Sequence, residues 1–193
     1  MGREFELKYK ADADVQRQIR EACPGDWRTI SMETTYYDTV DAILGKQCIT
    51  LRRRMENGVS VCTVKTPAIH GARGEWETEC GDIELAIPEL CKLGAPAELE
   101  TMTRGGVKPT CGAKFTRQAL TLALADCTVE LALDAGILLG GGREEPLCEV
   151  EVELKTGGDE AAVAFAREFS RRFGLEEENR SKFRRALALA AGE

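Results

Sequence analysis

Residues 147–155 read Leu-Cys-Glu-Val-Glu-Val-Glu-Leu-Lys, and apolar and acidic side chains alternate without a break from position 148 to position 154. Successive side chains of a β-strand point to opposite faces of the sheet, so Glu149, Glu151 and Glu153 share one face. An antiparallel strand that packs on one side only has this pattern. The stretch therefore predicts an antiparallel sheet with one apolar face and one ionic face.

The same alternation recurs along the chain, beginning at residues 4–9. Further strands are expected at 34–38, 48–55, 59–66, 73–80, 114–125 and 128–135. Glu56-Asn57-Gly58 separates two of them and is typical of a hairpin turn. The repeated spacing favours a large antiparallel sheet.

Helices are expected in three places. Apolar residues recur at helical spacing over 14–23, and again from Ala161 to Phe173, with a last helix starting at Ser181. Residues 81–114 show only weak helical periodicity, around 83–93, and carry no motif. The predicted class is α+β, mainly β.

Composition limits the classes of protein. The 193 residues, 43% hydrophobic and 31% charged, predict one folded domain over residues 1–193. A formal charge of −7 argues against nucleic acid or an anionic membrane as a partner. Without an apolar run of about 18 residues or an apolar signal core, a cytoplasmic protein is expected. The eight cysteines form no CxxC pair and are interpreted as reduced thiols.

The charged faces indicate what the sheet encloses if it closes. About eight antiparallel strands form a barrel whose interior can hold one small ligand. Hard oxygen ligands for Mg²⁺ or Mn²⁺ are available from Glu4, Glu6, Asp134, Glu149 and Glu151. Donors to phosphate oxygens are available from Lys8, Arg52, Arg54, Lys65, Arg73, Arg117 and Lys182, and no glycine-rich phosphate loop competes. A polyphosphate with a divalent cation is the natural ligand.

The simpler alternative is that each ionic face is an ordinary solvated surface. Cross-strand ion pairs contribute only a few tenths to about 1 kcal/mol each, and any single strand favours that interpretation. The ionic face recurs over six strands and consists of Arg and Glu in place of Ser, Thr and Gln. This recurrence favours charged side chains that line the interior of a barrel.

A series of short motifs in order along the chain carries a family resemblance: Glu4-Phe5-Glu6-Leu7-Lys8, Tyr36-Tyr37-Asp38-Thr39, Leu51-Arg52-Arg53-Arg54, Thr63-Val64-Lys65, Arg73-Gly74-Glu75-Trp76-Glu77, Arg117, Leu133-Asp134-Ala135-Gly136, Glu149-Val150-Glu151-Val152-Glu153-Leu154 and Ser181-Lys182-Phe183-Arg184-Arg185. With its ExExK opening, the chain resembles the CYTH family, the triphosphate tunnel metalloenzymes. The resemblance implies a closed eight-stranded antiparallel barrel with flanking helices, in which a tunnel binds a triphosphate and a divalent metal.

The resemblance also implies residue roles. The metal-binding set of the family matches Glu4, Glu6, Asp134, Glu149 and Glu151. The expected catalytic residues are Lys8, Glu4 and Glu6. The positions that hold the triphosphate match Lys8, Arg52, Arg54, Lys65, Arg117 and Lys182, and two further triphosphate-binding residues are expected at Arg73 and Arg185. Glu75, Glu77 and Glu153 are further candidates to which no role is assigned.

The implied activity is metal-dependent hydrolysis of a terminal phosphoanhydride bond, with inorganic tripolyphosphate as the expected substrate. Residues 115–185 look most like the bacterial inorganic triphosphatases, whose larger members add a helical CHAD domain that is not expected here. Alternatives are a class IV-type adenylyl cyclase, a thiamine triphosphatase, or a noncatalytic sensor of polyphosphate or nucleotide. A barrel for apolar ligands fits the charged faces poorly. The preferred metal and the oligomeric state, a homodimer included, stay open.

Overall fold

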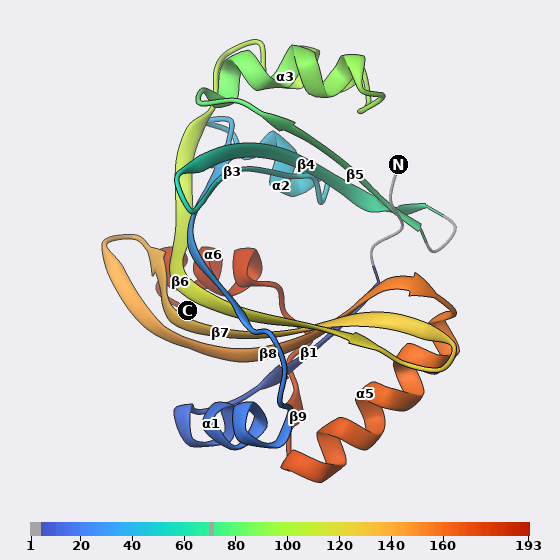
Figure 1. The fold of residues 1–193 in the computed structure, drawn as a ribbon. Coiled ribbons are helices and arrows are strands. Elements are labelled where there is room, and N and C mark those ends of the chain that lie inside the picture. The colour runs from blue at the N-terminus through green and yellow to red at the C-terminus, as the bar shows by residue number, and fades with distance from the viewer. Residues whose placement is uncertain (1–4, 70–71) are drawn as a thin grey trace.

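One long antiparallel sheet, strongly curved, organises the fold of the computed structural model (Figure 1). The structure describes residues 5–69 and 72–193. The strands are β1 (Glu6–Lys10), β2 (Arg28–Asp38), β3 (Thr50–Glu56), β4 (Val59–Ile69), β5 (Ala72–Glu79), β6 (Lys108–Ala123), β7 (Cys127–Gly140), β8 (Arg143–Gly157) and β9 (Glu176–Glu177). The helices are α1 (Ala13–Ala22), α2 (Ile43–Lys46), α3 (Ile83–Lys92), α4 (Glu98–Met102), α5 (Asp159–Phe173) and α6 (Lys182–Ala191).

The antiparallel sheet confirms the predicted mainly-β architecture. The predicted closure of the sheet is not confirmed. Its strand order is β5-β4-β3-β2-β6-β7-β8-β1-β9, and within the described residues no pairing joins the edge strands β5 and β9. The prediction of a closed eight-stranded barrel was wrong in strand number and in closure. The short β9 pairs with Tyr9 and Lys10 and occupies part of the edge of β1 that a closing strand would need. Alternation within one strand cannot reveal this, because closure depends on tilt and stagger between strands.

Most expected elements are confirmed with shifted ends. The Asn57-Gly58 turn is present, and both residues have the positive φ angles, 48° and 90°, that a tight hairpin requires. The interval 81–107 holds α3 and α4, and β6 begins earlier than expected, at Lys108. The short α2 and β9 were not predicted.

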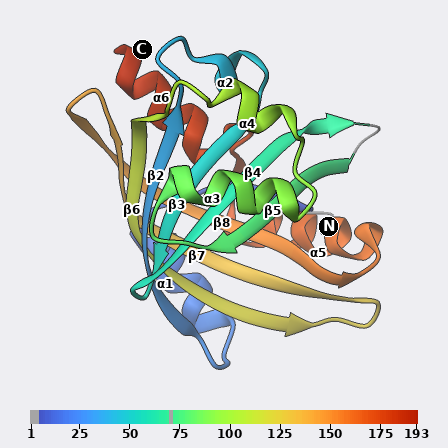
Figure 2. The same cartoon turned by 90° about the horizontal axis from the view of Figure 1, so that it is seen from above.

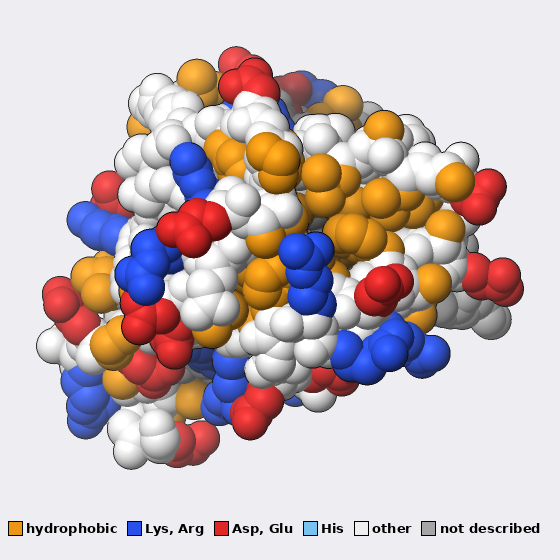
Figure 3. All heavy atoms as spheres, turned by 60° about the horizontal axis from the view of Figure 1, so that its bottom comes forward, with side chains coloured by type: hydrophobic (Ala, Val, Ile, Leu, Met, Phe, Trp, Pro, Cys, Tyr) orange, Lys and Arg blue, Asp and Glu red, His pale blue; other side chains and the backbone are white. Residues whose placement is uncertain are grey.

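Helices cover the convex side of the sheet in two places. α1 and α5 pack on β7, β8 and β1 through a core that includes Ile19, Leu131, Val150 and Phe169. Partly buried hydrophobic side chains pack against this core. On this side of the molecule, hydrophobic side chains are also visible at the surface (Figure 3). α3 and α4 cover β3, β4 and β5 at the other end of the sheet (Figure 2). Where these helices cover the sheet, the apolar faces of the strands point outward, toward the helices, and the ionic faces point inward.

α6 packs against β6 and β7. Ala186 is fully buried in a cluster with Tyr36, Phe115 and Leu138, and the rings of Tyr36 and Phe183 lie 4.9 Å apart. This packing fixes the first turn of α6 beside the ionic face of the sheet.

No helix within residues 5–69 and 72–193 has both the length and the apolar character needed to cross a membrane.

Gly140 allows α6 to approach β7 closely. A Cβ atom at position 140 would lie 2.3 Å from the carbonyl oxygen of Ala186 and 2.7 Å from the amide nitrogen of Ala190. Both are backbone atoms, so the helix itself would have to move.

We expect Gly140→Ala to lower the free energy of unfolding by about 1–3 kcal/mol, as overpacked sites do. Gly81→Ala is the matched control, because a Cβ atom there has nothing within 4 Å. Urea denaturation measures both variants. Equal stability of the two would contradict the close approach of α6.

Candidate functional site

A cavity of about 390 Å³ lies on the concave side of the sheet. Strands β1 to β8 and the start of α6 line it, and 15 of its 23 lining residues are charged. The cations are Lys8, Arg28, Arg52, Arg54, Lys65, Arg117, Lys155 and Lys182, and the anions are Glu6, Glu56, Glu75, Glu77, Glu130, Glu151 and Glu153. A lining of this kind suits a small, highly charged ligand that interacts with both signs of charge.

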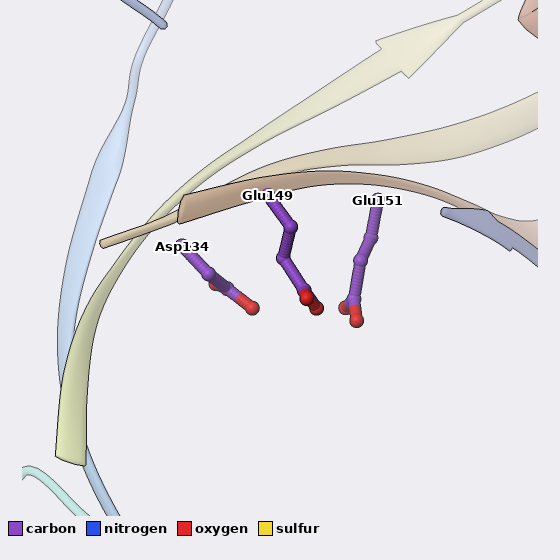
Figure 4. Close-up of side chains that lie close together, drawn as sticks. All are labelled: Asp134, Glu149 and Glu151. Atoms are coloured by element: carbon purple, nitrogen blue, oxygen red, sulfur yellow. The ribbon is translucent and has the colours of Figure 1, made fainter. Parts of the chain in front are cut away.

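Three buried carboxylates form an acidic cluster at one wall of the cavity. Asp134 on β7 and Glu149 and Glu151 on β8 are 0%, 0% and 6% exposed, and each offers an oxygen within 4.8 Å of the others (Figure 4). The register explains the proximity, since Asp134 lies directly opposite Glu149 and Glu151 follows two residues later on the same face.

Three cations compensate the acidic cluster. Lys182 Nζ lies 2.7 Å from Asp134 Oδ2 and 2.8 Å from Glu151 Oε1, and it also contacts Glu149. Arg117 donates from Nε and Nη2 to the two oxygens of Asp134, at 2.8 and 2.7 Å, and it also contacts Glu151.

Arg185 completes the compensation on the far side of the cluster. Its Nη1 donates to Glu149 Oε2 at 2.9 Å, and its Nη2 lies 3.3 Å from Glu145 Oε1. Three positive and three negative groups thus balance in a buried space, which a buried charge cluster requires.

The pKa shifts follow from this balance. Burial would lower the pKa of Lys182, but the carboxylates of Glu151, Asp134 and Glu149 outweigh burial and hold the pKa above its ordinary value. Burial would raise the pKa of Glu151, but Lys182 and Arg117 hold it well below the ordinary value. Burial raises the pKa of Glu149 despite the neighbouring Lys182.

The segment before α6 delivers Lys182 to the cluster. Ser181 caps the helix by accepting a hydrogen bond from Arg184 N at 3.2 Å, so Lys182 is the first helical residue. Glu178 N donates to the carbonyl of Lys8 on β1 at 2.9 Å. The Glu178 carboxylate accepts from the backbone N–H of Arg180 at 2.9 Å and from its guanidinium at 3.1 and 3.2 Å.

A second group of cations lies on β3 and β4. Arg52 Nη2 lies 3.6 and 3.7 Å from Glu75 and Glu77 on β5, and Lys65 Nζ lies 3.1 Å from Glu75. Burial, then the neighbouring Arg52, lowers the pKa of Arg54. These two Arg52 contacts are longer than good hydrogen bonds. A guanidinium offers paired donors that match phosphate oxygens.

Lys8 and Glu6 lie together on β1. Lys8 is directly opposite Glu151 in the sheet, and its Nζ donates to Glu6 Oε1 at 3.0 Å. Burial would lower the pKa of Lys8, but Glu6 and Glu151 outweigh it and raise the pKa. Lys8 is therefore a charged donor at neutral pH and not a base.

The structure brings many of the predicted site residues to one cavity. The predicted residues that line it are Lys8, Glu6, Arg52, Arg54, Lys65, Arg117, Glu151 and Lys182. Asp134 and Glu149 are fully buried just beneath its wall, and Arg185 lies behind Glu149. Glu6 pairs with Lys8 and does not join the acidic cluster. Glu4 and the side chain of Arg73 lie outside the described part of the chain.

Two residues of the cavity, Arg28 and Glu130, were not predicted from the sequence. They form an ion pair at 2.6 Å, and both line the cavity. A signal for Glu130 was present, because it lies four residues before Asp134 in a strand and therefore on the same face. Nothing in the local sequence around Arg28 indicated its role.

The acidic cluster fits a divalent cation by its donor chemistry. Its ligands are all carboxylate oxygens, which suit Mg²⁺ or Mn²⁺ better than zinc or copper. The contacts of Lys182 and Arg117 occupy the same oxygens, so a cation would have to share or replace them.

A curved antiparallel sheet around a charged cavity is the architecture that the comparisons with known proteins have to match. The chain belongs to the CYTH domain family, whose pattern matches residues 2–187. It is 29% identical over 132 residues to the inorganic triphosphatase of Haemophilus influenzae Rd, a match that covers 67% of this chain. The match spans only 38% of the length of that relative.

Solved structures share the fold. The PH1819 protein of Pyrococcus horikoshii OT3 has a TM-score of 0.65 at 23% identity, and the match covers 98% of this chain and 99% of that one. HpAC1 of Hippeastrum, an adenylyl cyclase candidate with a dominant triphosphatase activity, has a TM-score of 0.65 at 18% identity, with 98% and 96% covered. An adenylate cyclase candidate from Bacillus halodurans has a TM-score of 0.63 at 21% identity, with 96% and 98% covered.

Lys182→Met tests the charge balance of the acidic cluster. Loss of one partner leaves buried carboxylates uncompensated, so we expect the free energy of unfolding at pH 7.5 to fall by about 3–5 kcal/mol. Mg²⁺ or Mn²⁺ should then stabilise the variant more than the wild type, because the ion takes the place of Lys182. Urea denaturation with each metal and with EDTA measures both effects.

Lys155→Met is the matched control, because Lys155 pairs with Glu130 and Glu153 but is 39% exposed. Equal stability of Lys182→Met and Lys155→Met, or a Lys182→Met protein indifferent to divalent ions, would contradict the assignment.

Glu178 predicts a pH dependence of stability. The hydrogen bonds from Arg180 lower its pKa to about 2, so its contribution is complete above the ordinary pKa of 4.5 and is lost as the pH falls toward 2. We expect Glu178→Gln to lower Tm by a few degrees at pH 7, with a difference from wild type that shrinks below pH 4.5. Thermal unfolding from pH 7 to pH 3 measures it.

The control for this series is Glu176→Gln, since Glu176 is 79% exposed and its contact with Lys10 is 3.5 Å long. A Tm difference for Glu178→Gln that stays constant down to pH 3 would contradict the assigned pKa.

Proposed function

We propose that the protein hydrolyses a terminal phosphoanhydride bond of a triphosphate inside the cavity, with inorganic tripolyphosphate as substrate and Mg²⁺ or Mn²⁺ as cofactor. One observation carries the proposal: a cluster of buried carboxylates forms part of the wall of the same cavity that two groups of Arg and Lys side chains line. Its volume of about 390 Å³ falls within the range of small-molecule sites, roughly 300–1,000 Å³. The predominance of charged lining residues favours an inorganic polyanion.

The basic residues would bind the phosphate oxygens from two sides. Arg52, Arg54 and Lys65 would hold one part of the triphosphate, and Arg117 and Lys182 another. Guanidinium groups match phosphate geometry through paired donors, whereas the lysines act as point charges. Holding both parts would align the scissile bond for attack, and alignment provides much of the catalysis in phosphoryl transfer.

Asp134, Glu149 and Glu151 would hold the divalent cation. When bound, the cation supplies neutralisation of charge on the phosphate oxygens. Lys182 and Arg117 would then turn from the carboxylates toward phosphate, so that binding of the cation and binding of the triphosphate favour each other.

Lys8 would act next to the reacting phosphate as a charged donor. Its raised pKa keeps the ammonium group protonated, and its partner Glu6 fixes its position. A protonated lysine can orient water or stabilise the leaving phosphate, and preorganised charge of this kind is a large part of electrostatic catalysis.

Phosphate release from tripolyphosphate, thiamine triphosphate and ATP, each with Mg²⁺, Mn²⁺ or EDTA, tests the proposal. We expect metal-dependent cleavage of tripolyphosphate to pyrophosphate and phosphate, faster than cleavage of the other two. Binding without release would favour a sensor, and pyrophosphate with a cyclic nucleotide from ATP would favour a cyclase. Either result would overturn the proposal.

Arg52 and Arg53 provide a matched pair of variants. Arg52 lines the cavity, whereas Arg53 points to the opposite face and donates to the carbonyl of Gly81 at 2.9 Å. We expect Arg52→Gln to lower kcat/KM by about 10- to 100-fold, the loss of a charged hydrogen bond, and Arg53→Gln to leave it near wild type. Equal effects would place the substrate elsewhere.

Glu149→Gln tests the cation site within the same assay. We expect the folded variant to lose metal-dependent turnover, because one of the three carboxylate ligands becomes a neutral amide. Retained turnover in a folded Glu149→Gln protein would exclude the acidic cluster as the cation site.

A further inference from the structure

α1 contacts the backbone that carries the acidic cluster. Gln16 Nε2 donates to the carbonyl oxygen of Asp134 at 2.9 Å and to that of Glu149 at 3.0 Å. A side-chain amide nitrogen has two hydrogens, and both are used here. One side chain from the convex side of the sheet thus holds two of the three residues whose carboxylates point into the concave side.

The position of Gln16 is itself fixed. Asp12 caps α1 by accepting a hydrogen bond from Val15 N at 2.8 Å, and Ile19 is fully buried in the core between α1 and the sheet. These two contacts lie on either side of Gln16 in the helix. The amide is therefore presented to β7 and β8 by a helix that has little freedom to shift.

The two carbonyls belong to residues directly opposite each other in the β7–β8 ladder. A hydrogen bond to both fixes the separation and rotation of the two peptide units, and hence the directions of the Asp134 and Glu149 side chains. Cation affinity depends steeply on the spacing of carboxylate ligands, and partners that orient ligands commonly change it by about 10- to 100-fold.

We infer that Gln16 is a positioning residue for the cation site: it sets the spacing of the Asp134 and Glu149 carboxylates from the opposite side of the sheet. The inference rests on the cation site of the proposed function. It assigns α1 a role in metal affinity in addition to its role in the core.

The experiment compares Gln16→Met with Arg20→Met. Methionine has nearly the shape of glutamine but has no donor. Arg20, one turn further along α1, donates to Gln118 Oε1 at 2.7 Å, so its loss removes a contact between α1 and the sheet without touching the acidic cluster. Thermal unfolding establishes that each variant is folded.

Binding of Mn²⁺ alone, measured by the electron paramagnetic resonance signal of the free ion, is the main measurement. We expect Gln16→Met to weaken Mn²⁺ binding by about tenfold or more and Arg20→Met to change it less than twofold. In turnover, the half-saturating Mn²⁺ concentration should rise for Gln16→Met, with KM for tripolyphosphate at saturating Mn²⁺ unchanged. A purely structural role for Gln16 would not separate the two constants.

Gln16→Asn is the second variant, because its side chain is one methylene shorter and its amide cannot reach both carbonyls. We expect weaker Mn²⁺ binding here too. This variant keeps the inference testable if Gln16→Met does not fold. Wild-type affinity in a folded variant, or an equal loss in Arg20→Met, would overturn the inference and leave the proposed function intact. Absence of Mn²⁺ binding to the wild type would overturn the cation site itself.

Discussion

Three ionised carboxylates within 4.8 Å of one another in a buried space need cations to compensate them. This electrostatic requirement links distant parts of the chain. Asp134 and Glu149 come from adjacent strands, Arg117 from the strand before them, and Lys182 from the last helix. The ion cluster therefore joins the C-terminal helix to the middle of the sheet through charge as well as through apolar packing.

Several local features serve this arrangement. Gly140 lets α6 approach β7, Ser181 starts α6 one residue before Lys182, and Glu178 ties the preceding turn to β1. Each is a modest interaction on its own. Together they determine where one ammonium group lies, and so how the protein neutralises the acidic cluster.

The strands of the fold could be predicted from sequence because each one has two chemically different faces. The stretch Glu149–Leu154 shows this most clearly, because spacing alone put its glutamates on one face and its valines on the other. That the glutamates face inward was inferred from the recurrence of ionic faces over six strands and from the family resemblance. The closure of the sheet could not be predicted in this way, because it depends on how strands stagger over long distances. The two-residue β9 has too little sequence to give a pattern.

Part of the candidate site was predictable for the same reason. Period two put Arg52 and Arg54 on one face of a strand, and the resemblance to the CYTH family put them in one site with Asp134, Glu149 and Lys182. The pairing of Glu6 with Lys8 was not predictable, because it depends on side-chain conformation. Gln16 was also missed, since a helical glutamine that hydrogen-bonds to strand carbonyls leaves no trace in the periodicity.

The most direct test of the site is a crystal structure with Mn²⁺ and a triphosphate analogue whose bridging oxygens are replaced by imido groups. We expect the anomalous signal of Mn²⁺ next to Asp134, Glu149 and Glu151, with Lys182 Nζ moved onto a phosphate oxygen. Mn²⁺ bound away from these carboxylates, or an analogue in the cavity with Lys182 still paired to all three, would contradict the central claim that this ion cluster exchanges its internal cations for metal and substrate.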